Sequence, residues 1–243
     1  MPEGWGSLSQ EQLSHIINLM HVYGSHPDGM AILKTWALCY FCGFEVVRKN
    51  DGCWLCRDIA KRDFFLLDCS LLPWMMDRLE WLEHPELMET HLEIDGYSSE
   101  DQWLGGMPFS YYLQLENHYQ AYLVKPDEQY LMKMFDIMYT KKSRNARLPE
   151  GYMLLSVFLW FSAVKRYFAS VFTHFLKPVA SGQQTGTKTS QREMVAAQIR
   201  LLTKGDITKN QAVMETNTWD ALTELDALAQ DSEEFKRKYR NKG

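Results

Sequence analysis

The 243-residue sequence has neither an excess of basic residues nor an N-terminal export signal. Its 26 Lys and Arg are outnumbered by 31 Asp and Glu, which gives a formal net charge of -5. Proteins that bind duplex DNA usually present a basic surface to the phosphates, so this composition disfavours a nucleic-acid partner. The opening residues, MPEGWGSLSQEQL, contain neither a basic segment nor the apolar run of a signal peptide. We therefore expect a cytoplasmic protein.

The sequence also lacks a hydrophobic run of membrane-spanning length. Its longest apolar stretch, residues 152–164, contains two serines and is followed by Lys165 and Arg166. Because a spanning helix needs about 20 largely apolar residues, this stretch predicts a buried helix and no membrane partner. The five cysteines are an odd number in a chain without an export signal, which predicts free thiols rather than disulfides.

Common catalytic and nucleotide-binding motifs are missing as well. There is no Gly-x-Ser-x-Gly turn, no dinucleotide-binding glycine pattern and no Glu-x-x-His pair of a di-metal helical bundle. The segment 182–189, GQQTGTKT, fails as a phosphate loop because only three residues separate its glycines and Thr187 precedes Lys188. We expect no catalytic residue and no cofactor, although residues distant in the sequence could still assemble an enzyme site.

Hydrophobic periodicity predicts a mainly α protein. Ser9 and Gln12 have the spacing of a capping box, which marks the start of the first helix. In the second helix, which we expect to end at Gly43, Leu33 and Trp36 are predicted to face inward. The predicted helices after the first cover residues 28–42, 70–84, 109–123, 127–139, 151–175 and 191–204, then a stretch from about 209, then 219–239.

One region of the sequence predicts β-structure. Two β-favouring runs, 44–48 and 53–56, flank an Asp-Gly turn and predict a hairpin, and a third strand is expected at 63–67. The expected fold is a multi-helix globular body over 1–177, with a small antiparallel β-hairpin or three-stranded sheet whose hairpin covers about 44–57. Residues 178–190, rich in Gly, Ser and Thr, predict a flexible linker or long loop before a C-terminal helical segment at 191–243.

Four of the cysteines form two Cys-x-x-Cys pairs around the hairpin turn, Cys39 with Cys42 and Cys53 with Cys56. Two such pairs can supply the four thiolates of a zinc ribbon. Against this, the first pair lies at the end of a predicted helix, and Cys53 and Cys56 would project from opposite faces of a strand. Buried thiols without metal are the other interpretation, since free cysteine is commonly buried. A zinc-ribbon-like binding module therefore stays as the alternative function.

The last predicted helix carries an apolar stripe that is a candidate partner-binding site. It consists of Trp219, Leu222, Leu225 and Leu228. Such a stripe can pack on the protein's own body or on another protein, and the preceding linker permits both.

Several stretches together resemble a family of prophage tail-region proteins from gut bacteria. These are residues 2–5 with 8–13, 43–47 with the turn at 51–52, 115–119 with 122–123, 201–206 and 219–226. The resemblance implies a small, mostly helical protein without enzymatic activity that takes part in building a phage tail, as an assembly chaperone or adaptor. It also implies that the partners are other proteins, tail components among them, and that the protein is cytoplasmic or incorporated in a virion.

Overall fold

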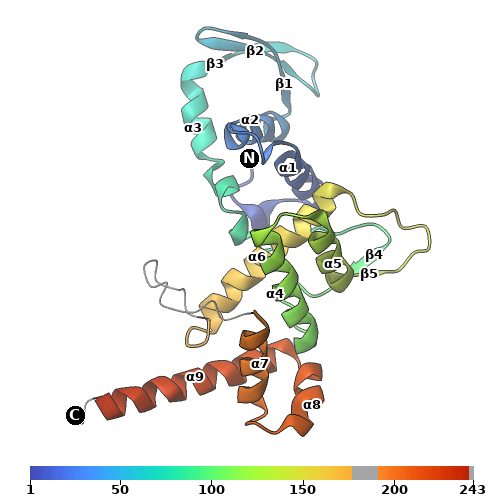
Figure 1. Ribbon diagram of the computed structural model, residues 1–243. Helices are drawn as coiled ribbons and strands as arrows, with labels where there is room; N and C mark the ends of the chain where they lie inside the picture. The colour runs from blue at the N-terminus through green and yellow to red at the C-terminus, as the bar shows by residue number, and fades with distance from the viewer. Residues whose placement is uncertain (177–190, 241–243) are drawn as a thin grey trace. The chain divides into compact units, whose positions relative to one another are not determined.

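A computed structural model describes residues 1–176 and 191–240 of the chain (Figure 1). The chain divides into two compact units, which are described separately: Met1–Ile94 with Arg147–Trp160, and Asp95–Ala146 with Phe161–Gly243. The described residues are mainly helical with a small antiparallel sheet, as the sequence predicts. The expected linker at 178–190 lies outside the described residues.

Unit 1 begins with two helices that pack on each other, α1 (Gln10–Tyr23) and α2 (Gly29–Cys42). The predicted capping box is present: the Ser9 hydroxyl accepts from the Gln12 N–H, and the Gln12 side chain accepts from the Ser9 N–H. Gly43 ends α2 in the left-handed conformation, with φ of 68°. These features confirm the predicted helix boundaries.

The prediction that Trp36 faces inward is wrong, because its side chain is 52% exposed. Leu33, Ala37 and Leu38 are buried instead. At 3.6 residues per turn Trp36 lies between Leu33 and Cys39 around the helix, and both of these are buried, so its angular position does not account for its exposure. The helix is apolar around most of its circumference, so periodicity alone does not determine which side is buried.

The predicted three-stranded sheet follows α2 directly and is antiparallel in the order β1-β2-β3. Its strands are β1 (Phe44–Asn50), β2 (Cys53–Asp58) and β3 (Phe64–Asp68). The register of β1 against β2 shifts between Val46 and Arg48, which leaves Val47 as a bulge. Most side chains of the sheet are at least partly exposed, and only Phe44, Cys56 and Leu67 are buried.

The helix predicted over 70–84 is much shorter in the structure. The segment forms the 3-10 turn η2 (Cys69–Leu71), then α3 (Leu72–Asp77), and then the 3-10 turns η3 (Glu80–Glu83) and η4 (Pro85–Leu87). The Trp5 indole N–H donates to the carbonyls of Trp81 and His84, at 3.0 and 2.9 Å. Leu79 and Leu82 are fully buried. Tertiary packing around Trp5 therefore overrides the helical pattern in this segment.

Unit 2 contains the remaining predicted helices. Two of them, over Phe109–Val124 and Glu128–Met138, bury Tyr112 and Leu115, and Leu131 and Phe135, respectively. The sequence did not predict the two-stranded pairing of β4 with β5. The elements of this unit are β4 (Tyr97–Ser99), α4 (Phe109–Val124), α5 (Glu128–Met138), β5 (Tyr139–Lys141), α7 (Gln191–Leu202), η5 (Ile207–Lys209), α8 (Asn210–Glu215) and α9 (Thr218–Arg240).

The longest apolar helix, α6 (Gly151–Val171), contributes its first ten residues to unit 1 and the rest to unit 2. By length and composition alone α6 could cross a membrane, and it is the one such helix among the described residues. Its side chains at Val157, Trp160, Phe161, Val164 and Phe168 are fully buried within the protein. This burial is typical of a core helix, as the sequence predicts.

Replacing Ser9 with alanine should lower the free energy of unfolding by about 1 kcal/mol, because the N–H of Gln12 loses its acceptor. Urea denaturation measures this change. Ser14→Ala, the same substitution inside α1, is the matched control and should leave stability unchanged or slightly higher. Equal losses for both variants would contradict a capping role for Ser9.

Replacing Trp160 with alanine should cost about 3–5 kcal/mol, because this fully buried side chain would leave a large cavity. Its indole also stacks on the His91 ring, with centroids 4.3 Å apart. Thermal unfolding followed by circular dichroism checks the loss. Trp160→Phe keeps most of the volume and should lose less, so equal losses for the two variants would contradict the packing described.

Candidate functional site

Unit 1 contains an apolar groove of about 760 Å³ between α2 and β1. Its position follows from the chain: β1 starts at the residue after Gly43, so the strand runs beside the helix that precedes it. The groove is lined by His15, Ile32, Thr35, Trp36, Cys39, Tyr40, Phe44, Glu45, Val46, Val47, Arg48, Lys49 and Ile59. We call this the α2–β1 groove.

The apolar part of the α2–β1 groove continues onto the protein surface. The side chains of Trp36, Val47 and Ile59 are each more than half exposed, at 52%, 51% and 59%. An exposed tryptophan among aliphatic side chains is a common feature of protein-binding surfaces.

His15 and Tyr40 form the more polar end of the groove. Their rings stack with centroids 4.0 Å apart and planes 21° from parallel. Burial lowers the pKa of His15, and the nearby Glu11 carboxylate opposes this only in part. Burial also raises the pKa of the Tyr40 hydroxyl, and Glu11 adds to that effect. Both side chains are therefore neutral near pH 7, and this end of the groove supplies hydrogen-bonding groups without charge.

The charged residues of the groove lie on β1. Glu45 forms an ion pair with Arg57 of β2, at 2.6 Å, so its charge is compensated within the sheet. Lys49 lies over the Trp54 ring, 4.8 Å from its centroid. With Glu45 compensated, the cationic side chains of Arg48 and Lys49 give this wall of the groove a positive character.

The structure does not bring the four cysteines of the two pairs together as zinc ligands. Cys39 and Cys56 are buried, Cys53 is half-buried, and Cys42 is exposed with its sulfur 3.9 Å from the Met1 sulfur. Throughout residues 1–176 and 191–240, no three His, Cys, Asp or Glu side chains are grouped so that they could hold a metal ion. Cys39 and Cys42 are three residues apart on α2 and so share one face of it, but among the described residues they do not form a ligand group of three or more.

The buried thiols have raised pKa values. Burial raises the pKa of Cys39 to about 11, and the nearby thiols of Cys56 and Cys42 add to the effect. Burial also raises the pKa of Cys42 and of Cys56. A thiol must lose its proton to bind zinc or to act as a nucleophile, so this environment opposes both.

The candidate stripe on α9 packs within unit 2. Leu222 and Leu225 are buried, and the Trp219 ring lies 5.2 Å from Phe168 of α6. The Trp219 indole N–H donates to the Trp103 carbonyl at 2.8 Å, while Leu228 is half-buried. Through these contacts, most of the stripe is already covered by other parts of the same chain. Partner binding through the stripe stays a prediction.

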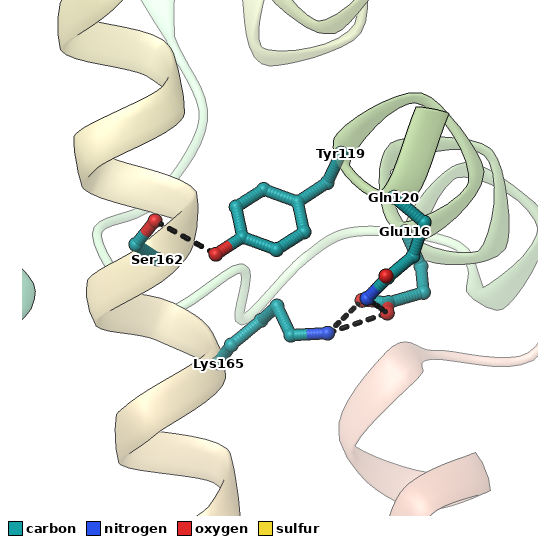
Figure 2. Close-up of polar contacts among 5 residues, drawn as sticks. All are labelled: Glu116, Tyr119, Gln120, Ser162 and Lys165. Carbon is teal, nitrogen blue, oxygen red and sulfur yellow. Dashed lines mark hydrogen bonds and ion pairs between the residues drawn. The ribbon is translucent and has the colours of Figure 1, made fainter. Parts of the chain in front are cut away.

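A polar cluster joins α4 and α6 inside unit 2 (Figure 2). The Lys165 ammonium forms an ion pair with Glu116, and the Gln120 amide donates to the same carboxylate at 2.8 Å. Nearby, the Ser162 hydroxyl donates to the Tyr119 hydroxyl at 3.1 Å, and Lys165 lies 5.1 Å from the centre of the Tyr119 ring. The polar groups of the cluster are hydrogen-bonded or ion-paired with one another, so the cluster stabilises the packing of α4 against α6.

The remaining sequence candidates do not add a site. His118 stacks near Tyr130, and burial together with Lys133 lowers its pKa, whereas Glu116 belongs to the cluster above. The two residues therefore serve different contacts. The glycine-containing segment 182–189 lies outside the described residues.

The α2–β1 groove was not predicted. The hydrophobic pattern of α2 places Trp36 in the core, and the hairpin residues carry no motif that indicates a binding site. A signal was available in the sequence of α2, GMAILKTWALCYFC, which has more apolar side chains than one buried face requires. An excess of this kind indicates a second apolar surface but does not show what covers it.

Alkylation of Cys39 should be strongly pH-dependent. With a pKa of about 11 in place of 9.0, its thiolate fraction at pH 8 is lower by roughly a hundredfold. Iodoacetamide labelling followed by peptide mass spectrometry should show slow labelling of the native protein and fast labelling in guanidinium chloride. Equal rates in the two states would contradict the burial of this thiol.

The same pKa shift has a consequence for stability. The folded protein keeps the Cys39 proton up to about pH 11, whereas the unfolded chain loses it near pH 9. This contribution to stability is thus complete below pH 9 and is lost as the pH rises toward 11. Cys39→Ala, which removes the titrating group, is the control and should weaken this alkaline loss.

Comparisons of the chain with models of protein families, with curated proteins and with solved structures find no match. The resemblance to prophage tail-region proteins therefore rests on the sequence stretches alone.

Proposed function

We propose that this protein binds other proteins during phage tail assembly, as a chaperone or adaptor. The sequence resemblance is the basis for assigning this role to tail assembly. The α2–β1 groove is the observation that supports binding of another protein. Its volume of about 760 Å³ is large enough to accept several side chains of a partner.

The surroundings of the groove favour a protein partner over a small molecule. The groove-lining side chains of Trp36, Val47 and Ile59 are each more than half exposed, so the apolar surface of the groove continues into the solvent-exposed surface. A small ligand inside the groove would leave much of this surface in water, at a cost of about 25 cal/mol per Å². A polypeptide segment can fill the groove and also cover the exposed apolar side chains at its surface.

The charges on the strand wall specify the chemistry of the segment. Arg48 and Lys49 lie on the β1 wall of the mostly apolar groove, and the Glu45 carboxylate of the same wall is paired with Arg57. An apolar segment flanked by acidic residues would match this arrangement, with the acidic side chains steering the approach. In the proposed role, the groove covers such a segment on a tail protein until it is built into the tail.

The test uses the exposed Trp36 of the groove. Trp36→Ala should reduce capture of tail components by at least tenfold when the tagged full-length protein is recovered from phage-producing cells and analysed by mass spectrometry. The reason is that an interface tryptophan commonly supplies 2 kcal/mol or more of binding free energy, on the order of a thirtyfold change in affinity.

Trp74→Ala is the matched control, because Trp74 is also exposed, at 60%, but lies on α3 and does not line the groove. This variant should capture tail components as the unchanged protein does. Recovery of no virion component by the unchanged protein would contradict the proposed function, and equal loss with both variants would contradict the assignment to the groove.

A further inference from the structure

The outer edge of β3 is exposed and apolar. This strand has the sequence Phe64-Phe65-Leu66-Leu67-Asp68 and hydrogen-bonds only to β2 within its sheet. Phe64 is 62% exposed and Leu66 is 67% exposed. Both project from the same face because they are two residues apart.

The two edges of this sheet differ in how they are protected against further pairing. β1 carries Glu45, Arg48 and Lys49 and is interrupted by the bulge at Val47, which are features that block addition of another strand. Residues 64–67 of β3 contain no charge, no proline and no bulge. An edge strand left unprotected in this way is a template for pairing with another strand.

The hydrogen bonds at the two ends of β3 show which of its backbone groups point outward. The Asp63 carbonyl accepts from Asp58, and the Cys69 N–H donates to Gly52, so these odd-numbered residues bond toward β2. In an antiparallel ladder the direction alternates with every residue. The N–H and C=O groups of Phe64 and Leu66 therefore point to the free edge.

We propose that β3 pairs with β3 of a second copy of this chain, antiparallel and around a two-fold axis at Phe65, to form a continuous six-stranded sheet. A two-fold axis makes the same edge self-complementary, as closed dimers require. This interface lies on a different strand from the α2–β1 groove and does not depend on the proposed function.

The alternation of backbone groups restricts the register of this pairing. Outward-pointing residues must lie opposite one another, so Phe64 can face Leu66 of the partner subunit but cannot face its Leu67. The excluded register is also the one that would place Asp63 opposite Asp68 of the partner subunit. With Phe65 on the axis, the two exposed apolar side chains of each strand form aromatic–aliphatic cross-strand pairs.

Apolar complementarity favours this register over its neighbours. Shifting it by two residues in one direction would place the Asp68 carboxylate, which accepts from the Ser70 N–H, opposite Phe64 of the partner subunit. Shifting it the other way would place Leu66 opposite Arg62 of the partner subunit. Arg62 cannot continue the ladder, because it is left-handed with φ of 63° and its N–H donates to the Asp58 carbonyl.

The size of the interface sets the expected affinity. A stable interface commonly buries about 800 Å² on each partner, and a single strand edge covers less than this. We therefore expect a dimer that dissociates in the micromolar range. Sedimentation velocity of the full-length protein from about 1 to 200 µM should show a shift from the 28.5 kDa monomer to twice that mass.

The first variant tests the backbone edge. Leu66→Pro removes an outward N–H and leaves the hydrogen bonds to β2 in place, so it should abolish the dimer. Leu66→Thr, which keeps the N–H and has high strand propensity, is the matched control and should retain a dimer weakened by no more than tenfold. Unchanged urea midpoints for both show that the monomer still folds.

Several outcomes would overturn the proposal. A protein that stays monomeric at 200 µM has no such interface. A dimer that persists in Leu66→Pro uses another surface. Loss of tail-protein capture in Trp36→Ala with an unchanged dimer would bear only on the groove.

Discussion

The passage from α2 into β1 at a single residue determines the arrangement of the sheet and groove of unit 1. Gly43 adopts a left-handed conformation in which its N–H lies 3.2 Å from the Tyr40 carbonyl, and β1 begins at the next residue. Its carbonyl accepts from the Ile59 N–H at 2.9 Å, which ties the end of β2 to the same point. Space around the Gly43 α-carbon is open, so the need for glycine comes from the backbone angle and not from crowding. Without a longer connection the hairpin has to start beside the helix, and the groove is the space between them.

Much of the fold could be predicted because it depends on local signals. Ser9 with Gln12, Gly43 and the Asp51-Gly52 turn each mark a boundary that the structure reproduces. The long helix α6 was predicted from its apolar run and is buried as expected. The prediction of one helix over 70–84 was wrong, because the Trp5 indole N–H donates to two backbone carbonyls of that segment. No local sequence pattern indicates a hydrogen-bond partner more than 70 residues away.

Most of the candidate site could not be predicted from the sequence. An apolar residue such as Trp36 has the same pattern whether it faces the core or the solvent, and only the packed neighbours decide. The four cysteines show the opposite difficulty, since their spacing fits a metal site, yet the described residues contain no group of three or more metal ligands. The outward direction of the backbone groups on β3 likewise depends on the register with β2, which spacing in the sequence does not reveal.

The division of the chain has a consequence for its synthesis. Unit 1 needs residues 147–160, which are translated only after residues 95–146 of unit 2. The ribosome must therefore deliver more than half of the polypeptide before the first unit can complete its core around Trp160. Until then, the buried faces of α1 and α2 lack part of their cover, and the nascent chain depends on the cell to keep them from aggregating.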